Sequence, residues 1–218
     1  VGTSLTQNQL YFWRIRAKNG IAYSGWSNVR AFATRPELPA SYTVNADVSF
    51  PTHGQASDYE PWDYRIIGLP GNSSQPISDF LPGAQGEDWE VYWDNGAASD
   101  YFVKFDGSTA FSCSTGKAFW IISKGTLTIQ DNVPSPALNP DNFTVSVSLH
   151  SGWNLICNPF GIDVPWEMVK AYNSNITVPI YYFNGSFTTT DVLTPGQGVY
   201  FYNANNLSSL RIPYPPDS

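Results

Sequence analysis

The chain has 218 residues, enough for one large domain or two small ones. Hydrophobic residues make up 42% of it and charged residues 13%, about half the usual charged share of about 25%, which argues against a disordered chain. The formal net charge of −7, without a basic stripe, argues against nucleic acid as a partner, and the longest apolar run is far shorter than the ~20 residues of a membrane span.

The glycine, proline and aromatic content favours strands and tight turns over helices, so we predict an all-β protein. The first predicted element is a hairpin. Residues 10–17 alternate, with Tyr11, Trp13 and Ile15 on one face, and a second strand follows over 29–34.

The sequence of this hairpin resembles the end of a bacterial fibronectin type III domain, in which a strand of the type Tyr-x-Trp-Arg-Val-Arg-Ala is followed by a Ser-x-Trp-Ser turn and a strand that ends in Phe-x-Thr. The matching residues are Tyr11, Trp13, Arg14, Arg16, Ala17, Ser24, Trp26, Ser27, Phe32 and Thr34. The resemblance covers about residues 1–34, the last two strands of a seven-strand sandwich. It implies an incomplete sandwich.

A lone two-stranded hairpin is at best marginally stable in water, so we expect its aromatic face to be covered. Three covers stay open: the rest of this chain, fibronectin-like strands preceding Val1, or a neighbouring subunit that adds strands across the open edge. Because the chain begins with Val1 rather than Met, we expect processing, an engineered boundary or a piece of a longer chain. Strand addition between subunits would build a filament.

A domain boundary is predicted near 35–42, where Arg35-Pro36-Glu37-Leu38-Pro39 is extended and proline-rich. A leading strand follows over 42–48, and then a loop rich in proline, glycine and serine over 51–61. We assign 35–61 to this linker and leading strand.

The rest of the chain contains an internal duplication. Residues 66–70 align with 155–159 and residues 92–96 with 181–185, both at an offset of 89 (155 − 66 and 181 − 92). Residues 116–121 align with 196–201 at an offset of 80 (196 − 116), so the second copy is nine residues shorter after its Asn-Gly turn.

We therefore predict two β-sandwich or barrel-like units. The first copy spans 62–131 and the second 143–213, with a linker over 132–142 and a tail over 214–218. Each copy is read as a strand ending in proline, a short helical segment (Ile77–Leu81, Trp166–Tyr172), a strand into an Asn-Gly hairpin turn, and two further strands.

The phrases at 152–160 (Gly-Trp-Asn-Leu-Ile-x-Asn-Pro-Phe) and 193–201 (Leu-Thr-Pro-Gly-Gln-Gly-Val-Tyr-Phe) resemble a duplicated β-rich module that follows fibronectin type III domains in large secreted or surface-anchored bacterial proteins. The first copy departs from it, with Gly68-Leu69 in place of Cys-Asn and Ser114-Thr115-Gly116 in place of Thr-Pro-Gly. The resemblance implies a module without catalytic activity on the outside of a bacterium.

Motifs for catalysis are missing from the sequence. His53 and His150 are the only histidines, neither has metal-ligand spacing, and we assign both to turns or the surface. A carboxylate pair for glycoside hydrolysis stays open because Asp88, Glu90, Asp94, Asp100 and Asp106 crowd one region. We predict that the protein is not an enzyme and needs no cofactor.

The sequence also contains residues for a calcium site and for a disulfide. Asp94, Asp100 and Asp106 offer the oxygen ligands that calcium prefers, but aspartate beside glycine is also ordinary turn chemistry. Cys113 and Cys157 lie in different copies; a disulfide between them and two free thiols both stay open.

Flat aromatic rings stack well on the apolar faces of sugars. We predict the tryptophans near loops or turns as platforms for a polysaccharide, and these are Trp62, Trp89, Trp93 and Trp166. Those inside apolar strands are assigned to the core, namely Trp120 and Trp153 together with Tyr181 and Tyr182.

Two function classes follow: a structural or adhesive surface module that assembles through strand addition, and a carbohydrate-binding accessory module of a secreted enzyme. A binding module should expose a row of aromatic rings. A structural module should bury them and expose open strand edges.

Overall fold

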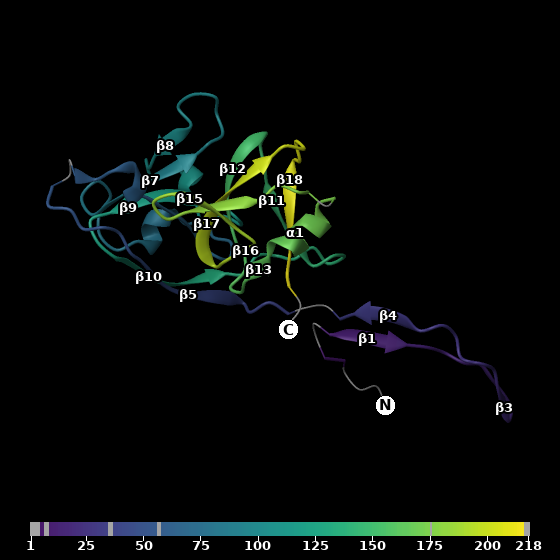
Figure 1. Ribbon diagram of the computed structural model, residues 1–218. Coiled ribbons are helices and arrows are strands. Elements are labelled where there is room, and N and C mark those ends of the chain that lie inside the picture. Colours follow the sequence, from purple (N-terminus) through teal and green to yellow (C-terminus); the bar gives the residue numbers. More distant parts are fainter. Residues whose placement is uncertain (1–4, 7–8, 35–36, 56–57, 175, 216–218) are drawn as a thin grey trace. The chain divides into compact units, whose positions relative to one another are not determined.

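We analysed a computed structural model that describes residues 5–6, 9–34, 37–55, 58–174 and 176–215 (Figure 1). The chain divides into two compact units, and the second unit runs from Pro39 to Pro215. The division falls inside the segment 35–42, where the sequence places a boundary. Antiparallel strands dominate and one α-helix is present among the described residues, so the predicted all-β class is confirmed.

The first unit is a ribbon of four short strands. β1 (Leu10–Trp13) pairs with β4 (Arg30–Ala33), and β2 (Lys18–Asn19) pairs with β3 (Ala22–Tyr23). The predicted strand over 10–17 is therefore interrupted. Between the two ladders the Ser27 hydroxyl accepts from the amide of Ile15 at 3.0 Å and the Ser24 hydroxyl accepts from the amide of Ala17 at 2.9 Å, so serine side chains replace carbonyl acceptors.

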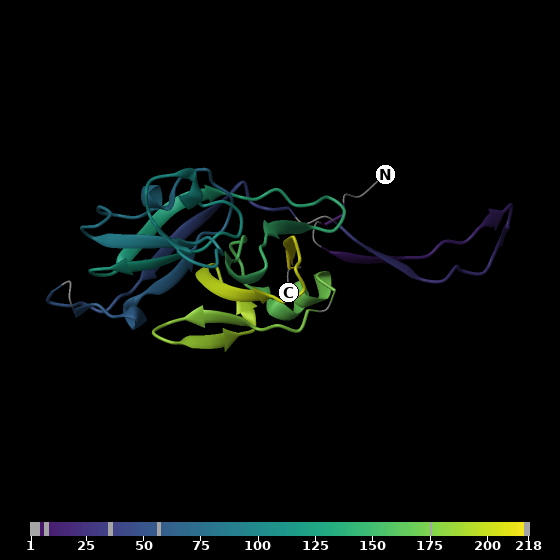
Figure 2. The ribbon, with the colours of Figure 1, turned by 90° about the horizontal axis from the view of Figure 1, so that it is seen from above.

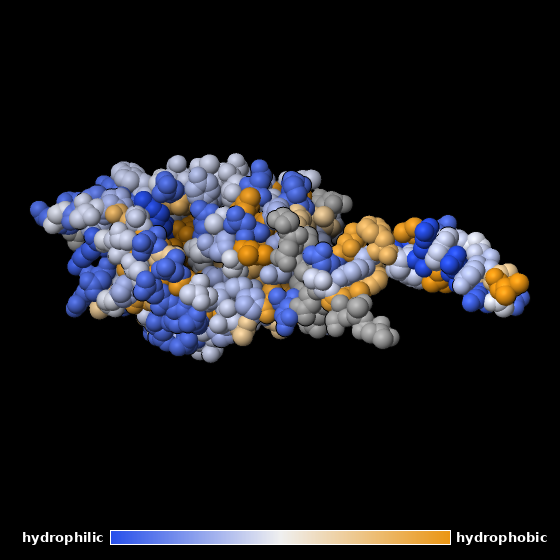
Figure 3. All heavy atoms as spheres, turned by 90° about the horizontal axis from the view of Figure 1, so that it is seen from below, coloured by the Kyte–Doolittle hydropathy of each residue, from blue (hydrophilic) through white to orange (hydrophobic). Residues whose placement is uncertain are grey.

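This ribbon carries many exposed apolar side chains, and Figure 3 shows hydrophobic residues beside hydrophilic ones on its surface. Phe12 is 69% exposed and Ile21 99% exposed. The guanidinium of Arg16 lies over the rings of Tyr23 and Trp26, at 4.0 and 4.5 Å from their centroids, so the cation stacks on two aromatic side chains of the ribbon.

The second unit contains both copies of the predicted repeat. The first copy begins with β5 (Ser41–Val48), which lies in the segment 35–61 that the sequence analysis separates from it, and its last strand, β10 (Leu127–Pro134), extends past the predicted end at 131. Between them lie β6 (Arg65–Gly68), β7 (Trp89–Asp94), β8 (Phe102–Lys104) and β9 (Phe119–Ser123), with 3₁₀ turns at η2 (Pro61–Asp63), η3 (Ile77–Phe80) and η4 (Thr109–Phe111). The second comprises β11 (Thr144–Ser148), β12 (Gly152–Cys157), β13 (Val164–Pro165), α1 (Trp166–Tyr172), β14 (Ile180–Phe183), β15 (Phe187–Thr190), β16 (Val192–Leu193), β17 (Gly196–Asn203) and β18 (Ser209–Pro213).

The two copies pair their strands in the same register. Ile66 lies opposite Trp120 between β6 and β9, and the aligned residues Leu155 and Tyr200 lie opposite each other between β12 and β17. The pairings of β7 with β9 and of β14 with β17 also correspond, since Tyr92 faces Trp120 and Tyr181 faces Tyr200. In each copy the leading strand pairs with the closing strand, β5 with β10 and β11 with β18.

The copies are joined edge to edge. The start of β17 pairs with the end of β6, with Gly196 opposite Gly68. The amide of Cys157 in turn donates to the carbonyl of Gly116 at 2.9 Å. In the repeat alignment Gly196 corresponds to Gly116 and Gly68 corresponds to Cys157, so the two contacts are equivalent. An approximate two-fold axis between the copies would relate them in this way. The two repeats therefore lie within one compact unit rather than in two separate ones.

Close packing at this junction explains a departure in the sequence of the first copy. A Cβ atom on Gly68 would lie 2.2 Å from the Cβ of Cys157, its aligned partner, and one on Gly198 would lie 2.8 Å from the Cβ of Ala118, its own partner. Aligned residues of the two copies face each other across the junction, Gly68 against Cys157 and Gly198 against Ala118. Each pair therefore has room for a side chain on one of its two members only.

The turns differ between the copies. Asn184 to Ser186 form a three-residue loop between β14 and β15, with Gly185 at φ +85°, and this hairpin lies at the lower edge of the second unit in Figure 2. In the first copy the loop between β7 and β8 runs over 95–101. The sequence predicts a tight Asn-Gly turn in both copies, but in the first copy Gly96 only opens a longer loop.

Candidate binding cleft

A large open cleft lies between the two copies, on the sheet face that carries Trp120 and Tyr200. Its volume is about 1250 Å³. Most lining residues are aromatic, and together they are Pro61, Tyr64, Tyr92, Asp94, Gly96, Ala97, Ala98, Tyr101, Phe102, Trp120, His150, Ser151, Gly152, Trp153, Tyr181, Phe183, Phe187 and Tyr200.

The rings form two matched sets, one from each copy. In the first set the ring centroids of Tyr64 and Tyr92 are 6.1 Å apart, and those of Tyr64 and Trp120 are 6.3 Å apart. In the second set the aligned pairs Trp153 with Tyr181 and Trp153 with Tyr200 are 5.8 and 6.0 Å apart.

A fourth ring extends each set from the hairpin strand. Phe102 lies 6.3 Å from Trp120, and Phe187 lies 5.9 Å from Tyr200. Phe102 and Phe187 hold corresponding register positions, opposite Asp94 and Phe183. The cleft therefore contains two aromatic half-sites of nearly the same geometry.

A hydrogen-bonded chain fixes the floor of the cleft. The indole of Trp120 donates to the hydroxyl of Tyr200 at 3.0 Å, and that hydroxyl donates to the carboxylate of Asp94 at 2.6 Å. Burial, together with the bond to Asp94, raises the pKa of Tyr200, so it stays a protonated donor at neutral pH. The floor is thus rigid and polar at one point.

A second network orients Tyr92. Its hydroxyl donates to Glu90 at 2.6 Å, and Lys104 donates to the other oxygen of Glu90 at 2.6 Å. The hydrogen bonds from Lys104 and Tyr92 lower the pKa of Glu90, which favours its ionised form, and burial raises the pKa of Tyr92.

His150 lies at the same end of the cleft as Asp94. Its ring lies directly against Gly96, where an added Cβ would come within 2.2 Å of Cε1. Nδ1 lies 2.9 Å from the carbonyl oxygen of Ser151, so Nδ1 carries the proton and Nε2 is left for other partners. Sequence reasoning assigns His150 to a turn or the surface, and the residue is half-buried in the loop between β11 and β12, where it also forms part of the cleft wall.

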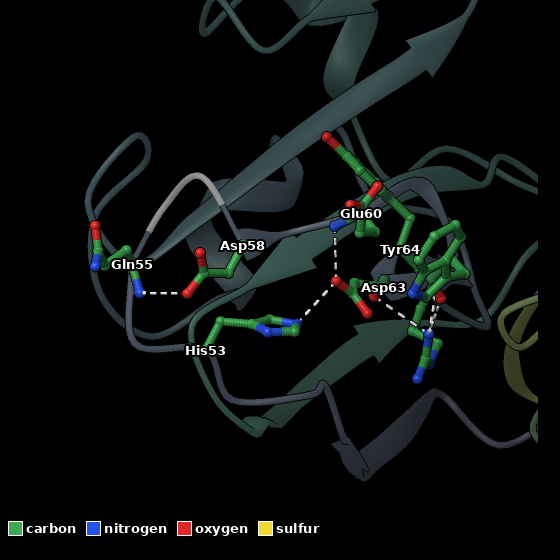
Figure 4. Close-up of polar contacts among 8 residues, drawn as sticks. His53, Gln55, Asp58, Glu60, Asp63 and Tyr64 are labelled. Carbon is green, nitrogen blue, oxygen red and sulfur yellow. Dashed lines mark hydrogen bonds and ion pairs between the residues drawn. The ribbon is translucent and has the colours of Figure 1, made fainter.

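The rim of the cleft at Pro61 and Tyr64 is held by the contacts in Figure 4. Oδ2 of Asp63, a buried carboxylate, lies 2.9 Å from Nε2 of His53 and accepts from the amide of Glu60 at 2.8 Å. Nη1 of Arg65 donates to the carbonyls of residues 62, 63 and 64 at 2.8–3.2 Å. These bonds fix the loop that carries the rim.

The predicted sugar platforms lie mostly elsewhere. Trp89 is 3% exposed and Trp166 1% exposed, so both belong to the core, and their choice as binding residues is wrong for this structure. Trp93 is half-buried against the first core, the hydrophobic cluster that includes Val91, Phe111 and Ile121, and Trp62 is 57% exposed outside the cleft lining.

The core assignment is confirmed for Trp120, which is 9% exposed in a hydrophobic cluster with Tyr181 packed against it, but it is wrong for Trp153, which is 48% exposed. Trp120, Trp153 and Tyr181 also line the cleft, a role that the sequence analysis missed. The repeat alignment contains a signal for them, because it places an aromatic residue at Tyr64 and Trp153, at Tyr92 and Tyr181, and at Trp120 and Tyr200.

The carboxylates proposed for calcium are not brought together. Among the described residues no group of three histidine, cysteine, aspartate or glutamate side chains is arranged to hold a metal ion. Asp94 accepts from Tyr200 and from the amide of Gly96, and Asp106 accepts from the amide of Ser108 at 2.9 Å. Asp100 sits at φ +52° in the β7–β8 loop.

Cys113 and Cys157 are buried free thiols, and the structure contains no disulfide between them. Burial raises the pKa of Cys113 to about 12 and also raises that of Cys157. Nearby, burial lowers the pKa of Lys117 to about 8, and its ammonium lies 4.0 Å from the ring centroid of Trp93. Lys117 thereby covers one face of a predicted sugar platform.

Comparison with protein-family models, with curated proteins and with solved structures gave no match. In the described part of the chain no helix is long and apolar enough to cross a membrane.

Proposed function

We propose that the second unit is a non-catalytic module that binds a polysaccharide chain in the aromatic cleft, as part of a secreted or surface-anchored bacterial protein. The two matched ring sets carry this proposal. Sugar rings have apolar faces that stack on aromatic side chains, and two half-sites of equal geometry suit a ligand whose successive units are alike. The bacterial setting rests on the resemblance of the two sequence phrases.

The size and polarity of the cleft support the same ligand class. Its volume of about 1250 Å³ is above the roughly 300–1,000 Å³ of ordinary small-molecule pockets, which favours a chain. Sugar hydroxyls also need hydrogen-bond partners, and the hydroxyls of Tyr92 and Tyr200 are already oriented by carboxylates. The proposal assigns no reaction to these carboxylates.

Substituting Trp153→Ala should weaken oligosaccharide binding by about tenfold or more, because aromatic anchors in a binding site commonly contribute about 2 kcal/mol. The measurement is calorimetric titration of the full chain with glucose, xylose and N-acetylglucosamine oligosaccharides. Trp62→Ala is the matched control, since Trp62 is similarly exposed but lies outside the cleft lining. Binding that is lost equally in both variants, or absent in the parent chain, contradicts the proposal.

The ribbon favours a second function, association of chains through strand addition. β1 and β4 pair only with each other in the described part of the chain, so their outer edges are open. Large apolar side chains lie exposed along the ribbon, including Leu10, Phe12, Ile15 and Val29. We propose a second copy of this chain as the partner, and an open head-to-tail contact of this kind would build a filament.

Substituting Phe12→Lys should abolish this association, because it places a charge on the apolar ribbon. Light scattering should show the parent chain growing in mass with concentration and the variant remaining a monomer. Ile162→Lys, which alters a surface residue of the second unit, should leave the association intact. A parent chain that stays monomeric at every concentration removes this second function.

A further inference from the structure

The two half-sites share their aromatic rings but differ in their polar groups. Asp94 in the first copy aligns with Phe183 in the second, and His150 in the second copy aligns with Pro61 in the first. All four residues line the cleft. One end therefore carries a carboxylate and an imidazole, and the other end carries a phenyl ring and a proline. A ligand of repeating units would meet a charged group at one end only.

Asp94 is the charged group that the fold leaves without a counter-ion. It is 9% exposed, and its two oxygens accept from the Gly96 amide at 2.9 Å and from the Tyr200 hydroxyl at 2.6 Å. Among the described residues no lysine, arginine or histidine forms an ion pair with it.

Two other carboxylates of the second unit differ in this respect. Glu90 is paired with Lys104 at 2.6 Å, and Asp63 contacts His53 at 2.9 Å. A buried carboxylate is costly unless it is paired as well as hydrogen-bonded. Among the described residues Asp94 therefore lacks the cationic partner that Glu90 and Asp63 have, and a cation bound in the cleft would supply it.

The rings beside Asp94 favour the same kind of ligand group. The electron-rich faces of tryptophan and tyrosine attract cations, and Trp120 and Tyr200 form the floor next to the carboxylate. An ammonium group also supplies three hydrogen-bond donors, whereas Asp94 can only accept. A cation placed here would contact a carboxylate and lie beside aromatic rings.

We propose that the cleft takes a glycan that bears free amino groups, with one ammonium group bound at Asp94. This inference rests on the proposed carbohydrate-binding function and adds the chemical class of the sugar. The repeated ring spacing is the reason for choosing an amino sugar over a cationic peptide, because successive sugar units offer the same apolar face to each half-site.

The test compares three tetrasaccharides of the same length, made of glucosamine, N-acetylglucosamine and glucose. Each is titrated into the full chain at about pH 6, where primary amines are protonated. We expect the glucosamine tetrasaccharide to bind at least about tenfold more tightly than the two neutral ones. Asp94→Asn should remove this advantage, so that the variant binds the three tetrasaccharides with the same affinity.

A charge-matched control is needed because a chain with a net charge of −7 attracts any cation. Asp191→Asn removes the same charge outside the cleft lining and should leave the preference intact. Should Asp94→Asn fail to fold, the three sugars are compared on the parent chain at about 0.5 M salt, where long-range attraction is screened and a preference for the glucosamine tetrasaccharide has to come from a group inside the cleft. Equal binding of all three overturns the amino-sugar inference and keeps the proposed function. If none of the three sugars binds, the amino-sugar inference and the proposed function are both overturned. If only a lysine-containing tetrapeptide binds, the ligand of the cleft is a peptide instead of a glycan.

Discussion

Substituting Trp166→Ala is expected to lower the free energy of unfolding by about 3–5 kcal/mol, the usual cost of removing a fully buried large aromatic side chain. Trp166 is 1% exposed, its ring centroid lies 5.6 Å from that of Phe201, and its indole donates to the carbonyl of Val178 at 2.9 Å. Urea unfolding followed by circular dichroism measures the loss.

Trp62→Ala again provides the control and should change stability by no more than about 0.5 kcal/mol, because Trp62 is a surface residue. The experiment also separates the two roles that Trp166 has been given. A Trp166→Ala variant of unchanged stability that binds glycans poorly would restore it as a sugar platform and contradict its place in the core.

Much of the fold can be read from the sequence because the repeat constrains it. The offset of 89 aligns Ile77 with Trp166, and both residues are buried in short helical segments, η3 and α1, close to where the sequence predicts them. The predicted identity of the ribbon as the end of a fibronectin type III domain stays a prediction. The interruption of its first strand could not be predicted, because it depends on serine hydroxyls accepting from backbone amides.

The aromatic residues of the cleft are harder to predict, because a strand that is apolar on both faces can pack one face in the core and line a binding site with the other. In β9, Phe119 and Ile121 belong to the first core, while Trp120 between them faces the cleft. The continuous run Phe119–Ile122 does not distinguish a core face from a binding face. The cleft exists only because the equivalent faces of the two copies meet, and this meeting is a tertiary contact that spacing along the chain does not encode.

Strand alternation does contain the correct answer for β7. Successive side chains of a strand point to opposite faces, so Trp89, Val91 and Trp93 share one face and Tyr92 and Asp94 share the other. The first three pack in or against the core, and the last two line the cleft. Proximity to a loop is therefore a weaker guide to binding residues than position on the pleat.

We also expect a large loss of stability from substitutions at the junction between the copies. Gly68→Ala should destabilise the protein by about 1–3 kcal/mol or more, as overpacking of a filled core does. The new methyl group would lie 2.2 Å from the Cβ of Cys157 and 3.1 Å from the carbonyl oxygen of Lys117. Cys157→Gly should also destabilise, because it leaves a cavity and removes the thiol that contacts this same carbonyl at 3.1 Å.

The double variant Gly68→Cys with Cys157→Gly moves the thiol from one copy to the equivalent position of the other. If an approximate two-fold axis relates the copies, the moved side chain enters the space that Cys157 vacates, and the double variant is more stable than the sum of the two single losses predicts. Urea unfolding of the parent, both single variants and the double variant gives the coupling energy, expected at about 1–3 kcal/mol in favour of the double variant. Strictly additive losses would mean that Gly68 and Cys157 are not equivalent positions, and the cleft would then be a chance meeting of aromatic rings rather than a product of the repeat.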